Sequence, residues 1–213
     1  MRKIKCEKKK PCQNCTRIAT TCTYDAIPQK KGPQGKRAKS IQQLQHYSTE
    51  RACSCVPNPG LLTPNLTEDC IQKFLTDVYP VLPILNRPFI ESATEAGLPE
   101  ANSMITALCA YIKIVKMSDA DFGNTLLEEA VRIQKGCAYY ENPSLLAIIT
   151  FYLFYSCHLH LGRDNSAWGY LRQATALAHL LNMHIEDAYT AAQWDVEVRC
   201  LYWALFTAER CDS

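Results

Sequence analysis

The chain has 213 residues, 47% of them apolar, so it can bury one substantial core and carry a small appended module. Its net charge of +2 conceals an uneven distribution, because residues 1–39 hold twelve basic and two acidic side chains. A basic head before an acidic body is typical of a nucleic-acid binder with a regulatory domain. The first ten residues lack the apolar segment of a secretory signal, and the apolar run Leu145 to Tyr155 is too short to span a membrane, so the composition argues against both classes.

Four cysteines lie close together near the start, with the spacing Cys6-x5-Cys12-x2-Cys15-x6-Cys22. Cysteines stay reduced in the cytosol and nucleus, so a tight cluster with a Cys-x2-Cys step indicates zinc thiolates and not disulfides. The lysines between them favour deprotonated thiols and attract a polyanion. The other eight cysteines are predicted to be small buried side chains: Cys53, Cys55, Cys70, Cys109, Cys137, Cys157, Cys200 and Cys211.

This stretch resembles the fungal zinc-cluster (Zn2Cys6) DNA-binding domain, in which six cysteines share two zinc ions. Cys6, Cys12, Cys15 and Cys22 match the third to sixth cysteines of that pattern. The first Cys-x2-Cys pair would fall before Met1, so the resemblance predicts a chain truncated at its beginning. The four matching cysteines are expected to bind one zinc ion, in a weaker site than the complete cluster.

The resemblance also implies which side chains contact DNA. Arg2 and Lys3 match positions that read base edges in the major groove, where basic donors suit the O6 and N7 acceptors of guanine. The implied partner is double-stranded DNA with CGG-type triplets, and the implied location is the nucleus. Without the first cysteine pair, binding is expected to be salt-dependent but unspecific. The predicted DNA-binding residues are Arg2, Lys3, Lys5, Lys9, Lys10, Arg17, Lys30, Lys31, Lys36 and Arg37.

The composition changes after the cysteine cluster. Residues 28–39 combine Gly and Pro with several basic side chains, which predicts a phosphate-tracking linker that can also serve as a nuclear import signal. Residues 40–47 favour a short helix, in the place where members of the family begin a dimerising coiled coil. The sequence therefore leaves undecided whether the chain forms a homodimer. The predicted domains are a partial zinc cluster over 1–25, a linker over 26–66 and a helical body over 67–213.

The body shows helical periodicity and no alternating strand pattern, which predicts an all-α bundle. Thr67 is predicted to cap its first helix, and a capping box formed by Thr190 and Gln193 is predicted to open its last. Further helices are predicted over 88–95, 99–116, 124–140, 144–161 and 166–183. The helix over 144–161 is the most apolar and is expected at the centre of the bundle.

The body also resembles the fungal-specific transcription factor domain, the regulatory region that follows zinc clusters in the same proteins. The resemblance is carried by His160 to Arg163, by Ala167 to Ala178 and by Glu197 to Trp203. It implies a regulator of the xylanolytic-activator type, acting on sugar or polysaccharide use, whose domain continues beyond Ser213. The chain is therefore interpreted as a fragment of a zinc-dependent, sequence-specific transcription factor of RNA polymerase II genes.

Enzyme classes find little support in the sequence. Asp121-Phe122-Gly123 imitates a kinase motif, but no Gly-rich loop precedes it. His158 and His160 are two residues apart on a helix, so they face different ways and cannot share a metal. Two alternatives stay open: a truncated regulator that acts only as a helical interaction or ligand-sensing module, and a helical enzyme with an accidental cysteine cluster.

Overall fold

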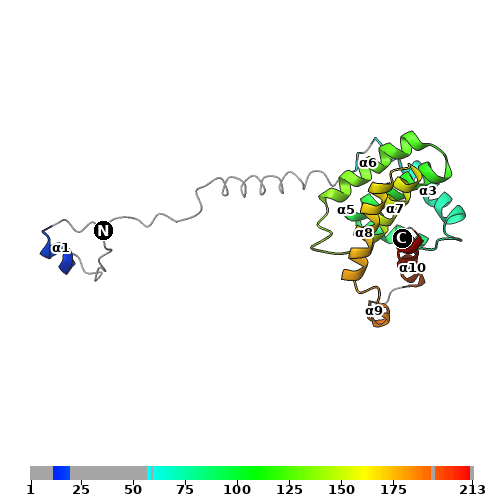
Figure 1. Cartoon of the computed structure of the whole chain (residues 1–213). Coiled ribbons are helices and arrows are strands. Elements are labelled where there is room, and N and C mark those ends of the chain that lie inside the picture. Colours follow the sequence, from blue (N-terminus) through cyan, green and yellow to red (C-terminus); the bar gives the residue numbers. More distant parts are fainter. Residues whose placement is uncertain (1–11, 20–56, 59, 193–194, 212–213) are drawn as a thin grey trace. The chain divides into compact units, whose positions relative to one another are not determined.

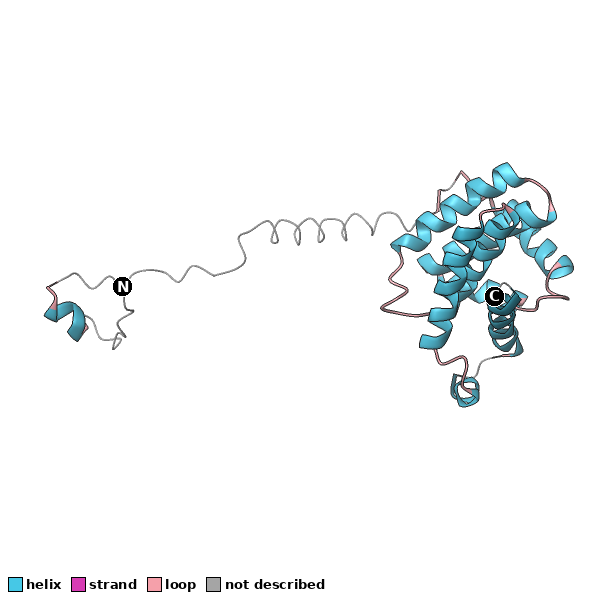
Figure 2. Cartoon of the chain, viewed as in Figure 1, coloured by secondary structure: helices cyan, strands magenta, loops and turns pink. Residues whose placement is uncertain are grey.

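The structure is a computed structural model, and it describes residues 12–19, 57–58, 60–192 and 195–211 (Figure 1). The chain divides into two compact units, Met1–Gln45 and His46–Ser213. Across the described residues all regular structure is helical, as Figure 2 shows, so the predicted all-α fold class is confirmed. The predicted linker helix over 40–47 lies outside the described residues.

In the first unit the structure describes one short helix, α1 (Gln13–Arg17). The second unit has a helical body that is described from residue 57 onward. Its helices, in chain order, are α3 (Pro64–Asp77), α4 (Arg87–Ala96), α5 (Pro99–Tyr111), the π-helix η1 (Ile112–Lys116), α6 (Ala120–Gly136), α7 (Leu145–His160), α8 (Asp164–Leu180), α9 (Glu186–Ala192) and α10 (Val196–Cys211).

The start of α3 is set by Thr63 and not by Thr67. The Thr63 side chain accepts a hydrogen bond from the backbone N–H of Leu66 at 3.3 Å, and Pro64 occupies the first helical position, where no N–H partner is needed. Thr67 lies one turn into the helix and donates its hydroxyl to the Thr63 carbonyl at 3.1 Å. The predicted cap at Thr67 is therefore wrong, because the proline favours the earlier start.

Two apolar helices, α5 and α7, form the centre of the body. Both are buried along most of their length, and α7 packs against α5 and α8 while α5 packs against α6. Ser144 caps α7 by accepting from the Ala147 N–H at 3.2 Å. Gly162, with a φ of 66°, adopts the left-handed conformation between α7 and α8, so the chain turns there at little steric cost.

α6 approaches η1 closely near its first turn, at Gly123. α6 starts at Ala120, four residues before the prediction, and its Gly123 faces η1. A Cβ at Gly123 would lie 2.5 Å from Cγ1 of Ile114, so only glycine fits this contact without displacing the neighbour. The motif that imitates a kinase sequence therefore has a packing role.

The last helix does not begin at the predicted capping box. Thr190 lies inside α9, and α10 begins at Val196, so the prediction that one helix starts at Thr190 is wrong; Gln193 lies outside the described residues. One side of α10 buries Val198 and Leu201 next to α8, whereas Trp203 on α10 is 56% exposed.

Candidate metal centre and nucleic-acid interface

The described part of the predicted metal site is a single turn that holds two cysteines. Cys12 immediately precedes α1 and Cys15 lies within it. The Cys-x2-Cys spacing is about one helical turn, so the two side chains lie on the same side. The backbone N–H of Cys15 donates to Sγ of Cys12 at 3.4 Å, and Cys12 is only 3% exposed. Thr16 strengthens the turn, because its hydroxyl donates to the Cys12 carbonyl at 3.1 Å.

This turn fits a zinc ion through the chemistry of its donors. Thiolate sulfur suits zinc, and Cys-x2-Cys is the ligand spacing of structural zinc sites. An N–H aimed at Sγ of Cys12 stabilises negative charge on that sulfur, as a metal-bound thiolate requires. In the part of the chain that the structure describes, no group of three or more metal-ligating side chains comes together. Cys6 and Cys22, the other two predicted ligands, lie outside the described residues.

Of the predicted DNA-binding residues, the structure describes Arg17 alone. It ends α1, two residues after Cys15, and its side chain is exposed. A cation at the last turn of a helix interacts favourably with the helix dipole. The remaining nine predicted DNA contacts lie outside the described residues: Arg2, Lys3, Lys5, Lys9, Lys10, Lys30, Lys31, Lys36 and Arg37.

The cysteines of the body have a different environment from the pair at α1. Cys70, Cys109 and Cys157 are buried in the apolar core, and burial alone raises the pKa of the Cys157 thiol far above its ordinary value. A thiol whose pKa is raised in this way stays protonated, and buried cysteines pack as small apolar side chains. Cys137 and Cys200 are half-buried, so the prediction of buried cysteines holds fully for the first three. Cys53 and Cys55 lie outside the described residues.

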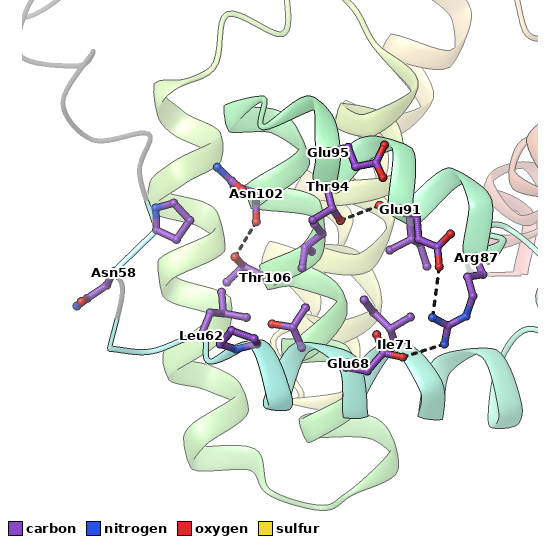
Figure 3. A pocket seen from close by; sticks show the side chains of 15 residues that line it. Asn58, Leu62, Glu68, Ile71, Arg87, Glu91, Thr94, Glu95, Asn102 and Thr106 are labelled. Atoms are coloured by element: carbon purple, nitrogen blue, oxygen red, sulfur yellow. Dashed lines mark hydrogen bonds and ion pairs between the residues drawn. The ribbon is translucent and has the colours of Figure 1, made fainter.

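The body carries a cavity of about 550 Å³ between α3, α4 and α5 (Figure 3). Its floor is apolar, with Ile71, Ile90 and Ile105, and its rim is charged. Arg87 on the rim is already paired, donating to Glu68 at 3.0 Å and facing Glu91 at 3.5 Å. The guanidinium group of Arg87 is therefore already bonded within the protein and is not left for a ligand of this cavity.

A segment from the N-terminal side of α3 lies along one side of this cavity. Pro57 and Asn58 belong to its lining, and the backbone N–H of Asn58 donates to Glu129 on α6 at 2.8 Å. Glu129 also accepts from Arg132 at 2.7 Å. Hydrogen bonds from Arg132 and from Asn58 lower the pKa of Glu129 against the opposing effect of burial, so the carboxylate that holds this segment stays charged at neutral pH.

A second, smaller cavity of about 320 Å³ lies between α6, α7 and α8. Aromatic side chains and glutamines line it, and sequence reasoning did not find it. The sequence feature that could have pointed to this cavity is Gln134, a polar residue among the inward-facing apolar positions of its helix. The side chain of Gln134 is buried, only 2% exposed.

The histidines of α7 do not form a metal site. His158 is buried against the ring of Tyr170, with ring centres 5.1 Å apart, whereas His160 is exposed and its Nδ1 lies 3.0 Å from the Ser156 carbonyl. The two side chains face different ways, as their spacing predicts. Within the described ranges, no helix is both long enough and apolar enough to cross a membrane.

Comparison with known proteins matches residues 1–31 to the family model described as the fungal Zn(2)-Cys(6) binuclear cluster domain. Over 225 residues the chain is 20% identical to the maltose fermentation regulatory protein MAL13 of Saccharomyces cerevisiae. It is 22% identical over 237 residues to the maltose fermentation regulatory protein MAL63 of the same species. It is 23% identical over 229 residues to the probable sucrose utilization protein SUC1 of Candida albicans.

These alignments differ in how much of each protein they cover. They include 98% to 99% of this chain but only 44% to 48% of the relatives. The chain therefore spans about half the length of the curated relatives it matches. No solved structure matches the chain.

Proposed function

We propose that the chain is part of a zinc-dependent transcription factor that binds DNA at specific sequences, because residues 1–31 match the model of the fungal Zn(2)-Cys(6) binuclear cluster domain. Zinc is the metal of that family. The protein acts on RNA polymerase II genes in the nucleus and has no enzymatic role. Genes of carbohydrate use are its targets, in line with the names of its relatives, two maltose fermentation regulatory proteins and a probable sucrose utilization protein.

The observation that carries this proposal is the Cys12–Cys15 turn inside the matched region. Its hydrogen bond from the Cys15 N–H to the Cys12 sulfur supports metal ligation, and Arg17 follows on the same short helix. In the proposal, Cys6, Cys12, Cys15 and Cys22 hold zinc when it is bound. The zinc supplies no reaction chemistry, since its role is to fix the fold of the head.

The basic residues of the head then have two roles. Arg2 and Lys3 read CGG-type triplets in the major groove, while Lys5 and the basic residues up to Arg37 contact phosphates. The proposed domains are the zinc cluster over 1–25, the linker over 26–66 and the regulatory body over 67–213. A homodimer would place two such heads on paired half-sites.

A competition shift assay at fixed salt tests this function. It compares CGG-containing and scrambled duplexes on two proteins, residues 1–213 and the same chain extended upstream by Cys-x2-Cys-Arg. For the extended protein we expect the CGG duplex to be preferred by about 1–3 kcal/mol per good base contact. For the unextended chain we expect nearly equal affinities, because residues 1–213 supply only four of the six cysteines of the family pattern.

The outcomes separate the parts of the proposal. Absence of CGG preference in both proteins would contradict sequence-specific recognition of this triplet. Strong preference in the unextended chain would instead mean that the first cysteine pair is dispensable. A salt titration gives the phosphate contribution independently, since the logarithm of the affinity falls linearly with the logarithm of salt concentration as counterions are released.

A further inference from the structure

The smaller cavity of the body lies between three helices and has a volume of about 320 Å³. α6 contributes Gln134, α7 contributes Phe151 and Phe154, and α8 contributes Tyr170 and Gln173. Tyr139, from the segment between α6 and α7, completes the wall. This volume is at the lower end of the range of about 300–1,000 Å³ for small-molecule sites, so it suits a compact ligand and not a peptide.

The aromatic wall is continuous and its rings are set at different angles. Tyr139 meets Phe151 edge to face at 4.9 Å between ring centres, and Phe154 meets Tyr170 in the same manner at 5.2 Å. Phe151 and Tyr170 are nearly parallel, with 6.1 Å between their centres, so they face each other and leave no slot between them. A wall of this kind presents faces and edges to a ligand, but its two nearly parallel rings are too close together for a flat ring to enter between them.

Gln134 is the second and independent feature of this cavity. It lines the cavity and is only 2% exposed, and neither Oε1 nor Nε2 has a hydrogen-bond partner in the described structure. A buried amide left without partners costs about 1–3 kcal/mol, so such a group is rare unless something else satisfies it. A ligand that suits Gln134 must therefore both donate and accept hydrogen bonds.

We propose that this cavity is a binding site for a small neutral polyhydroxylated molecule, a monosaccharide or one end of a disaccharide. A sugar hydroxyl donates to Oε1 of Gln134 or accepts from Nε2, and neighbouring hydroxyls serve both atoms at once. The C–H face of a sugar ring packs on aromatic rings, whose faces carry partial negative charge. Apolar walls with a few well-placed polar groups are the usual composition of ligand sites.

Other ligand classes fit less well. The described lining contains no carboxylate, and its one charged residue, Lys135, is basic, which disfavours a cationic ligand. A purely apolar ligand would leave Gln134 without partners. A nucleobase that stacks between two rings would need a wider gap than the one between Phe151 and Tyr170.

This cavity contrasts with the larger one, where Arg87 is paired with Glu68 and Gln72 within the protein. The cavity and Gln134 do not depend on the proposed function, whereas the choice of maltose, sucrose and glucose as probes rests on it. The test of the site requires no DNA, so sugar binding and DNA recognition can fail separately.

The experiment titrates the purified chain with maltose, sucrose and glucose, and with adenosine for comparison, by calorimetry and compares it with two variants. Gln134→Leu removes the amide and keeps a side chain of similar size, and Gln72→Leu makes the same change at an exposed position on α3. We expect at least one sugar to bind the parent and Gln72→Leu equally, and to bind Gln134→Leu about tenfold or more weakly.

Thermal melts separate a binding role of Gln134 from a structural one. Without sugar, Gln134→Leu should melt at the same temperature as the parent or higher, because it removes a polar group without partners. With sugar, the melting temperature should rise for the parent and rise less for Gln134→Leu. Three results would overturn the proposal: no binding of any of the three sugars, equal sugar binding by Gln134→Leu, or tighter binding of adenosine than of the sugars.

Discussion

The cysteine-rich head and the helical body are stabilised by different kinds of interaction. Among the described residues of the head, Cys12 is the one buried apolar side chain, and it is also a predicted metal ligand. The body instead has a continuous core that joins all its major helices, with large buried side chains such as Phe74, Met104 and Phe154. A short segment without a core depends on metal ligation, whereas a body of this size is stabilised by apolar burial. The two regions should therefore respond to different perturbations.

Removing the metal should give the largest effect and should act on the head alone. Structural zinc contributes about 10–16 kcal/mol in small zinc-binding peptides, so a chelator should unfold the head and weaken its DNA binding while the thermal melt of the body stays unchanged. Cys15→Ser should have the same effect, and Cys200→Ser, a half-buried position on α10, serves as the matched control. Metal analysis should find one zinc per chain. A Cys15→Ser protein with unaltered zinc content would refute the ligand assignment.

A core truncation should act on the body alone. Leu108 on α5 is fully buried, so Leu108→Ala should lower the free energy of unfolding by about 2–5 kcal/mol through lost burial and a residual cavity. Leu159 on α7 is 43% exposed, and Leu159→Ala should change stability by less than about 0.5 kcal/mol. Urea unfolding followed by circular dichroism measures both. Equal losses at the two positions would mean that burial does not distinguish them.

Two glycine substitutions test the packing between helices of the body. A Cβ at Gly123 would collide with Ile114, so Gly123→Ala should destabilise the protein by about 1–3 kcal/mol. Gly169 in α8 has no atom within 4 Å of an added Cβ, so Gly169→Ala should stabilise by about 0.5–1 kcal/mol because alanine favours the helix. The opposite signs of the two changes form the test in urea unfolding. A stabilising Gly123→Ala would show that η1 can move away from α6.

The sequence allowed the helical class and most of the helix positions of the body to be predicted, because apolar periodicity is a local property. Helix ends were harder to predict where two residues could each cap the same helix. Thr63 and Thr67 can both cap α3, and Pro64 decides between them. Likewise, the capping box at Thr190 matched a local pattern, but Thr190 lies inside the short helix α9.

The two kinds of site differed in how far they could be predicted. The predicted zinc ligands follow from spacing within seventeen residues, so Cys12 and Cys15 could be proposed without a structure. The aromatic cavity forms where side chains from α6, α7 and α8 leave space between them, and such a gap depends on packing between distant segments. Gln134 gave a signal as a polar residue on an apolar face, but that signal alone could not indicate a cavity.

The smallest expected effect concerns the pH dependence of the body and centres on His158. This side chain is 9% exposed, its Nδ1 has no partner in the described structure, and its ring stacks on Tyr170. Burial, followed by the positive charge of Arg163, lowers the pKa of His158 below its usual value. The folded protein therefore resists protonation at this site, while the unfolded chain takes up a proton near pH 6.5.

The sign of the effect follows from proton linkage. Above about pH 6.5 neither state is protonated at His158, so the residue adds no pH dependence. As the pH falls below that value, the unfolded state binds more protons and stability decreases, until the pH passes the lowered pKa of the folded state. His158→Gln should reduce the loss of stability between pH 7.5 and 5.5 in urea unfolding. Glu129 and Glu197, whose pKa values are lowered, lose their contributions only below their ordinary titration range, so they do not obscure this window. An identical pH dependence in the parent and His158→Gln would mean that this histidine is as easily protonated in the fold as in the unfolded chain.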